Sequence, residues 1–292
     1  MPLQSFTGSF GSQLESVQRS NVAYSNTTIV ANASAGTFTA TPVQFVASTP
    51  FDVTWLRIIN TATCANSNAR NDVMIDIMVG GAGSETSVAT FLFGARPANS
   101  SYTIPIYIPS GSRISGRTAA GVGSRSLTWA LELRGGPSRD LGGLPSRWVM
   151  YGQTASTAYG TAITYGSTNA WGSWTALTTS TTYAHDLWLP MVGSGTATTI
   201  TAVNYRTQFA AASITDAATM VTNSTGVFEA PMLLGTTGEA VGALGSAGQF
   251  NIGLDDIIYA PRASATAFSV RGMCSGTPVA SAVTCAILAA VK

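Results

Sequence analysis

The chain has 292 residues, of which 45% are hydrophobic and only 9% are charged, and its formal net charge is +1. This apolar content excludes a disordered polypeptide, and the absence of a basic run gives no support to nucleic-acid binding. Val, Ile, Thr and aromatic residues favour strands, so the composition predicts an all-β protein of about two domains. A surface with so few charges suits a protein packed against neighbours, although a secreted, hydroxyl-rich β-protein has the same composition.

Residues 1–19 precede the strand signals and are expected to form an N-terminal arm. They show neither the basic region nor the apolar region of a signal peptide, so we expect none. The longest apolar run, residues 283–291, is too short to cross a bilayer, and no membrane partner is expected.

Residues 20–134 contain short strand signals separated by turn residues, and we interpret them as the first β-sandwich domain. Pro105 indicates an edge strand or a bulge. Many short strands with Gly-rich turns predict a sandwich or barrel, jelly roll included. The expected strands cover residues 37–40, 53–59, 73–79, 102–108 and 126–133.

Landmarks of this first domain recur in the same order farther along the chain. Two Gly pairs and two Pro residues indicate a Gly/Pro linker at residues 135–153, and the second domain then covers residues 154–292. The ordered matches predict an internal duplication into two tandem β-sandwich (jelly-roll-like) domains, with an insertion near residues 194–228. Part of the insertion, residues 210–222, allows a helix. The matched residues are Tyr24 with Tyr159, Trp55 with Trp188, Gly80 with Gly235, Pro109 with Pro261, Arg117 with Arg271 and Ser126 with Ser281.

The sequence offers few groups for catalysis or metal binding. The single histidine, His185, is followed by Asp186 on the same expected strand, where neighbouring side chains point to opposite faces, so a structural role is favoured over a triad. Cys64, Cys274 and Cys285 lack metal-binding spacing; the last two could pair, but buried free thiols are favoured. Nucleotide-binding glycine patterns are absent. We therefore expect no enzyme, no cofactor and no metal site.

Two glutamates share a position in the predicted repeat. Glu85 and Glu239 each follow a Gly-rich turn after an apolar strand. A carboxylate there could bind a cation, but pairing with Arg113 or Arg117, or capping of the turn, is favoured.

Trp171 and Trp174 lie in a turn-like stretch in which exposed rings are plausible. Such rings stack on sugars, anchor protein interfaces or pack in the core, and the sequence leaves these three uses open.

Two segments of the first domain carry a resemblance to a known class of proteins. Residues 76–85 form a strand, a Gly-rich turn and a Glu, and residues 104–117 end in the run Pro-Ser-Gly-Ser-Arg-Ile-Ser-Gly-Arg. Together they resemble a class of tailed-bacteriophage virion proteins, over about residues 48–134. The second domain keeps Arg262 and Arg271 but lacks the Ser-Gly-Ser-Arg-Ile core.

The resemblance implies a non-enzymatic structural component of a virion with jelly-roll-like domains. It implies localisation in the virion and packing against other virion proteins and further copies of the chain, but leaves open capsid decoration, neck or tail. Because side chains four apart on a strand share a face, Arg113 and Arg117 could reach one row of acceptors on a neighbouring chain. The interface candidates are Arg113, Arg117, Glu85, Arg271 and Glu239.

The alternative is a carbohydrate-binding adhesin or receptor-binding module that binds a host surface glycan through Trp171 and Trp174. A β-sandwich glycan hydrolase has less support, because only 13 acidic residues are present and none lies in a recognisable context.

Overall fold

The computed structural model shows an all-β fold of several antiparallel sheets with one short helix, as the composition predicts. The N-terminal arm predicted at residues 1–19 lies outside the described residues. The structure describes residues 22–61, 73–93, 100–121, 123–135, 143–153, 160–163, 165–166, 169–194, 203–219, 227–234, 257–274 and 283–291.

The first eight strands form two four-stranded sheets. Their orders, β1-β8-β3-β6 and β2-β7-β4-β5, are those of a jelly roll, in which both sheets mix strands from distant parts of the sequence. The strands are β1 (Val22–Val30), β2 (Val43–Val46), β3 (Val53–Asn60), β4 (Val73–Val79), β5 (Thr86–Phe93), β6 (Ser100–Ile108), β7 (Ile114–Ala120) and β8 (Ser126–Gly135).

The remaining strands repeat this order. Their sheets are β10-β17-β12-β15 and β11-β16-β13-β14, so β10 to β17 take the places of β1 to β8, while β9 pairs with β17 beside β10. The equal topology is what a duplication requires, and the duplication itself stays a prediction. The elements are β9 (Trp148–Tyr151), β10 (Thr161–Ala162), β11 (Thr175–Thr178), β12 (His185–Ser194), β13 (Val203–Ala210), α2 (Ile214–Thr219), β14 (Val227–Leu234), β15 (Ile258–Arg262), β16 (Phe268–Cys274) and β17 (Val283–Ala290).

The sheet order corrects one part of the predicted repeat. The match of Gly80 with Gly235 would make β14 the counterpart of β4, but β13 holds that place and β14 takes the place of β5. Glu239 follows β14 and lies outside the described residues, so it is not the counterpart of Glu85. The segment interpreted as an insertion, residues 194–228, contains the framework strand β13 together with α2, and the segment interpreted as a linker contains β9.

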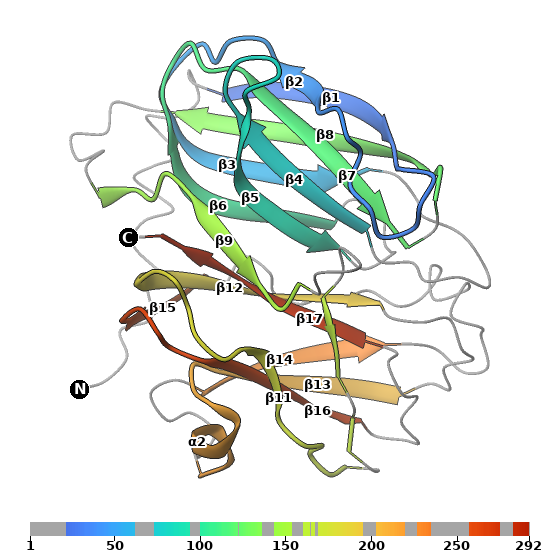
Figure 1. The fold of residues 1–292 in the computed structure, drawn as a ribbon, viewed down its shortest axis with the longest axis vertical. Coiled ribbons are helices and arrows are strands. Elements are labelled where there is room, and N and C mark those ends of the chain that lie inside the picture. The colour runs from blue at the N-terminus through green and yellow to red at the C-terminus, as the bar shows by residue number, and fades with distance from the viewer. Residues whose placement is uncertain are drawn as a thin grey trace.

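The two jelly rolls share one hydrophobic core. β5 of the first packs against β9, β12 and β17 of the second, and Figure 1 shows these three strands on the side of the second sandwich that faces the first. Leu92 of β5 donates its backbone N–H to the sulfur of Met191 on β12 at 3.4 Å. Because side chains alternate along a strand, β17 faces the first jelly roll with Ala286, Leu288 and Ala290 and its own sandwich with the residues between them. Within the described residues, no helix has the length and apolar character that a membrane-spanning segment requires.

Candidate functional site: arginine clusters on the two jelly rolls

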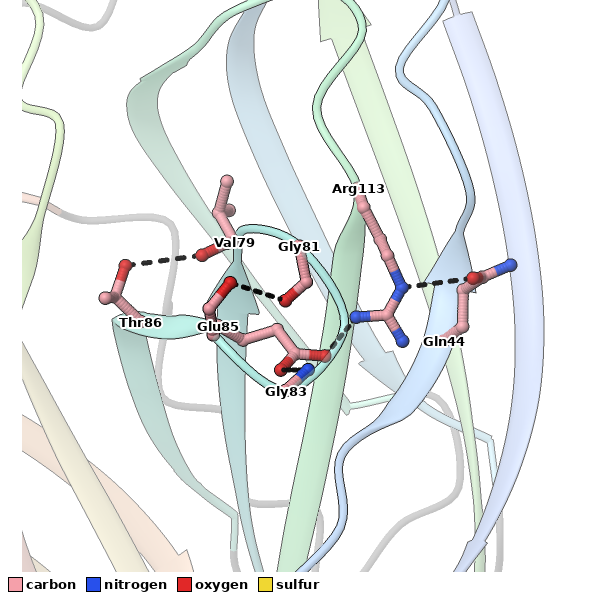
Figure 2. A network of polar contacts seen from close by, with 8 residues as sticks. Gln44, Val79, Gly81, Gly83, Glu85, Thr86 and Arg113 are labelled. Carbon is pink, nitrogen blue, oxygen red and sulfur yellow. Dashed lines mark hydrogen bonds and ion pairs between the residues drawn. The ribbon is translucent and has the colours of Figure 1, made fainter.

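Glu85 and Arg113 form an ion pair at the turn between β4 and β5 (Figure 2). The Glu85 carboxylate also accepts the Gly83 N–H at 2.7 Å, and Gly83 adopts a φ of 81°, a conformation that favours glycine. Arg113 donates from Nε to Oε1 of Gln44 at 3.1 Å, which ties β2 to the same turn. Pairing and turn capping, the roles favoured for Glu85 from the sequence, are therefore both present.

The Glu85 side chain is only 4% exposed and that of Arg113 is 18% exposed. Hydrogen bonds from its own backbone N–H and from the Arg113 guanidinium stabilise the charged carboxylate and lower the pKa of Glu85 below its usual value. The opposite charges of Glu85 and Arg113 thus neutralise each other within the chain.

Arg117 has a different carboxylate partner, Asp76. The two residues lie opposite each other in the ladder between β7 and β4, and Arg117 Nε lies 2.8 Å from Asp76 Oδ2. Oδ1 of the buried Asp76 accepts the hydroxyls of Ser87 and Thr90 at 2.5 and 3.0 Å. The Arg117 guanidinium also lies 5.1 Å from the centre of the Phe38 ring.

The structure differs here from the expected row of outward arginines. Arg113 precedes β7, which begins at Ile114, so the spacing rule for one strand does not apply to this pair. Each guanidinium pairs with a separate carboxylate of the same chain. Neither arginine is therefore an unpaired charge that awaits an acceptor on a neighbouring chain.

In the second jelly roll, Arg271 and both candidate tryptophans form one cluster. Arg271 donates from Nε to Oε1 of Gln208 at 2.8 Å, and its guanidinium lies 5.1 Å from the Trp171 ring centre and 4.6 Å from that of Trp174. Burial disfavours the charged form and lowers the pKa of Arg271. Trp174 is 8% exposed and packs with Ala210 and two other alanines near α2, so the ring serves as core.

The clusters of Arg117 and Arg271 occupy equivalent places. Arg271 lies opposite Gln208 in the ladder between β16 and β13, the counterparts of β7 and β4. The aromatic residues also correspond, because Phe38 lies between β1 and β2 and the tryptophans lie between β10 and β11. The difference is chemical: the first arginine faces a carboxylate, Asp76, and the second faces a neutral amide, Gln208.

A third charge cluster, missed from the sequence, lies on the outer face of the sheet β1-β8-β3-β6. Glu132 on β8 is 5% exposed and contacts Arg134 at 2.5 Å and Arg57 on β3 at 3.6 Å. Arg57 also donates to the Ser101 hydroxyl on β6. The spacing of Glu132 and Arg134 along an alternating strand indicates a shared face, but the contribution of Arg57 depends on strand pairing.

His185 has the structural role that the sequence favours. Its Nδ1–H donates to the Ala290 carbonyl at 2.6 Å, which leaves Nε2 to accept the Tyr151 hydroxyl at 2.9 Å. Burial lowers the pKa of His185 and so keeps the imidazole neutral. Cys274 and Cys285 are free buried thiols, and Cys64 lies outside the described residues. Among the described residues, no group of three His, Cys, Asp or Glu side chains is arranged to hold a metal ion.

No family model and no curated protein matches the sequence. The chain is similar to PNGase F, a glycosylasparaginase from Flavobacterium meningosepticum, with 10% identity, a TM-score of 0.36 and coverage of 93% of this chain and 96% of that one. It is also similar to the viral capsid protein STIV MCP, with 11% identity, a TM-score of 0.33 and coverage of 92% and 96%. A third similar structure is the infectious bursal disease virus VP2 subviral particle, with 10% identity, a TM-score of 0.28 and coverage of 92% and 71%.

These similarities contradict one expectation from the sequence. Because solved amidase structures are among those that resemble this chain along most of its length, the exclusion of enzymes is wrong and is not kept. At these TM-scores the similarities assign neither an activity nor a particle to the chain.

Proposed function

We propose that the chain is a structural component of a bacteriophage virion that packs against other copies of itself and against other virion proteins. The observation that carries the proposal is the way in which the two segments of the virion-protein resemblance meet. Asp76 and Glu85, which begin and end the first segment, pair with Arg117 and Arg113 of the second. The resemblance therefore falls on one connected structural unit, which supports a shared fold more strongly than two separate short runs would.

The turn at Pro109 and Ser110 is also held by hydrogen bonds to residues outside the two segments. Ser110 donates its N–H to Asp52 at 2.7 Å, and the Thr49 hydroxyl donates to the Pro109 carbonyl at 2.8 Å. Gly111 has a φ of 79°, which explains the glycine of the Pro-Ser-Gly-Ser-Arg-Ile run. The run thus keeps a defined shape at the end of the sandwich.

The charge distribution supports packing in an assembly. Only 9% of the residues are charged, and the carboxylates of Asp76, Glu85 and Glu132 are each neutralised by arginine within the chain. Little net charge is left to keep copies apart, which suits a protein that functions among closely packed neighbours. The carbohydrate-binding alternative has less support, because Trp174 is buried and the Arg271 guanidinium already lies over both rings.

The proposal is tested on particles from the natural source of the gene. Virions purified by density gradient should contain the chain in a fixed ratio to the major structural protein, measured by quantitative mass spectrometry. Immunogold labelling should then place it in the capsid, neck or tail. Recovery of the chain only in the particle-free fraction would refute the proposal, and a glycan array with strong hits would instead support the adhesin.

A further inference from the structure

We propose that β1 is an interaction edge, at which the β1 strand of a second copy pairs antiparallel and joins two sheets into one. The inference rests on the proposed function for its biological meaning and deepens it by naming one partner, a second copy of this chain. Its evidence comes from a comparison of the edge strands.

An edge strand presents unpaired N–H and C=O groups that bond to another strand unless something prevents it. Most described edge strands carry such protection. β2, β9, β10 and β11 have four residues or fewer. β6, β14 and β15 contain Pro105, Pro231 and Pro261, and β5 is covered by the second jelly roll.

Of the edge strands that the structure describes, β1 alone lacks every one of these devices. It has nine residues, Val-Ala-Tyr-Ser-Asn-Thr-Thr-Ile-Val, with no proline, glycine or charge. Tyr24 and Val30, on its outer face, are 75% and 55% exposed. Its inward residues Ala23, Ser25 and Thr27 are only half-buried, whereas the inward Leu127, Trp129, Leu131 and Leu133 of β8 are buried.

The ladder shows which backbone groups of β1 are not bonded to β8. Ala31 donates its N–H to the Arg125 carbonyl at 2.7 Å, one position beyond the pair formed by Val30 and Ser126. Since antiparallel pairs alternate between bonded and non-bonded, odd-numbered residues of β1 bond to β8. The even-numbered residues from Val22 to Val30 therefore direct N–H and C=O toward the open edge.

An identical strand fits this edge with two-fold symmetry. One register pairs all five even-numbered residues of β1 with those of the second copy. It places Asn26 opposite Asn26, Tyr24 opposite Thr28 and Val22 opposite Val30. This register brings no like charges together and pairs an aromatic with a β-branched residue, which is favourable across strands. A two-fold contact uses the same surface on both copies and closes as a dimer.

Two opposite substitutions at the symmetry axis test this arrangement. Asn26 is exposed, so Asn26→Lys and Asn26→Glu should leave the fold intact while placing like charges opposite each other in the dimer. In sedimentation equilibrium the wild type should dimerise, and each variant alone should have a dimer Kd raised at least about tenfold. An equimolar mixture of the two variants should regain the dimer, because opposite charges then meet at the axis.

Thr28→Pro provides a second test, because it removes an outward N–H and no backbone bond to β8, although the exposed hydrogen bond between the Thr28 and Thr128 hydroxyls is also lost. Ser126→Lys is the matched control: it adds a charge to the same face on β8, away from the edge, and should leave the dimer Kd unchanged. A wild type that stays monomeric at roughly 100 µM, where micromolar complexes form, would overturn the inference, as would a dimer unaffected by all three β1 variants. Either result leaves the virion proposal standing, whereas absence from particles refutes that proposal even if the dimer forms.

Discussion

Replacement of Arg117 by Met is expected to destabilise the protein more than the same replacement of the equivalent Arg271. The Asp76 side chain is 2% exposed, and without Arg117 its charge is met only by the hydroxyls of Ser87 and Thr90. Removal of one partner of a buried pair costs about 3–5 kcal/mol because the other charge stays buried. We expect about 2–3 kcal/mol here, because the Arg117 side chain is 35% exposed and water screens part of the interaction.

Arg271→Met leaves no buried carboxylate behind, because the residue opposite is Gln208. The loss of one hydrogen bond and of the contacts with two tryptophan rings amounts to about 1–2 kcal/mol. In calorimetry the melting temperature should therefore fall by roughly 3–5 °C for Arg117→Met and by roughly 2–3 °C for Arg271→Met. Arg147→Met, at an exposed position, controls for the change of residue type.

A double variant separates the contribution of the buried charge. If an unpaired carboxylate causes the loss, Asp76→Asn combined with Arg117→Met should be more stable than Arg117→Met alone. Equal losses for Arg117→Met and Arg271→Met, with no recovery in the double variant, would refute the reasoning.

Three further predictions concern pH and the shared core. The pKa of Glu85 in the folded protein is below its ordinary 4.5. The stability that its ionised carboxylate contributes is therefore present above pH 4.5 and is lost as the pH falls through the folded pKa. Glu85→Gln should flatten this part of the plot of melting temperature against pH. The folded pKa of His185 is below its ordinary 6.5, so the unfolded chain binds the proton first and stability falls below pH 6.5; His185→Gln should remove that slope, and an unchanged slope would contradict the assignment. Leu92→Ala should cost about 2–5 kcal/mol and shift a single calorimetric transition, because Leu92 belongs to the core of both jelly rolls, whereas two separate transitions would show that they unfold independently.

Half of the strands of the first jelly roll could be predicted from the sequence: β3, β4, β6 and β8 were expected, whereas β1, β2, β5 and β7 were not, and the strand expected at residues 37–40 is absent. The expected segments 53–59 and 73–79 correspond to β3 and β4, because apolar runs there end at turn residues. The position of the segment that begins at Ala230 could not be predicted in the same way. It shares an apolar run, a glycine and a glutamate with the segment at Asp76, but its place in the sheet depends on its partner strands, which a local pattern does not encode.

The same reason limits what could be known of the candidate site. Pairing of Glu85 with Arg113 followed from a nearby turn and two opposite charges, so the sequence suggested it. The partnership of Asp76 and Arg117 requires the register between β4 and β7, which the sequence does not reveal. Trp171 was singled out apart from Arg271, and the two come together because a bridge between Trp171 and Met273 lays the segment before β11 along β16.

The two equivalent sheets show which surface remains for a partner. β17 is buried on both faces, which explains why residues 285–291 form an unbroken apolar run in the sequence. Its counterpart β8 alternates, with Ser126 and Arg134 exposed on the outer face and Glu132 neutralised between two arginines. Within the described residues, the first sheet is thus covered on one face only and has β1 as an edge strand. Because the outer face of β1 is mostly polar and β1 carries no charge, this edge suits a contact between chains that have already folded, whereas the apolar face of β17 is part of folding itself.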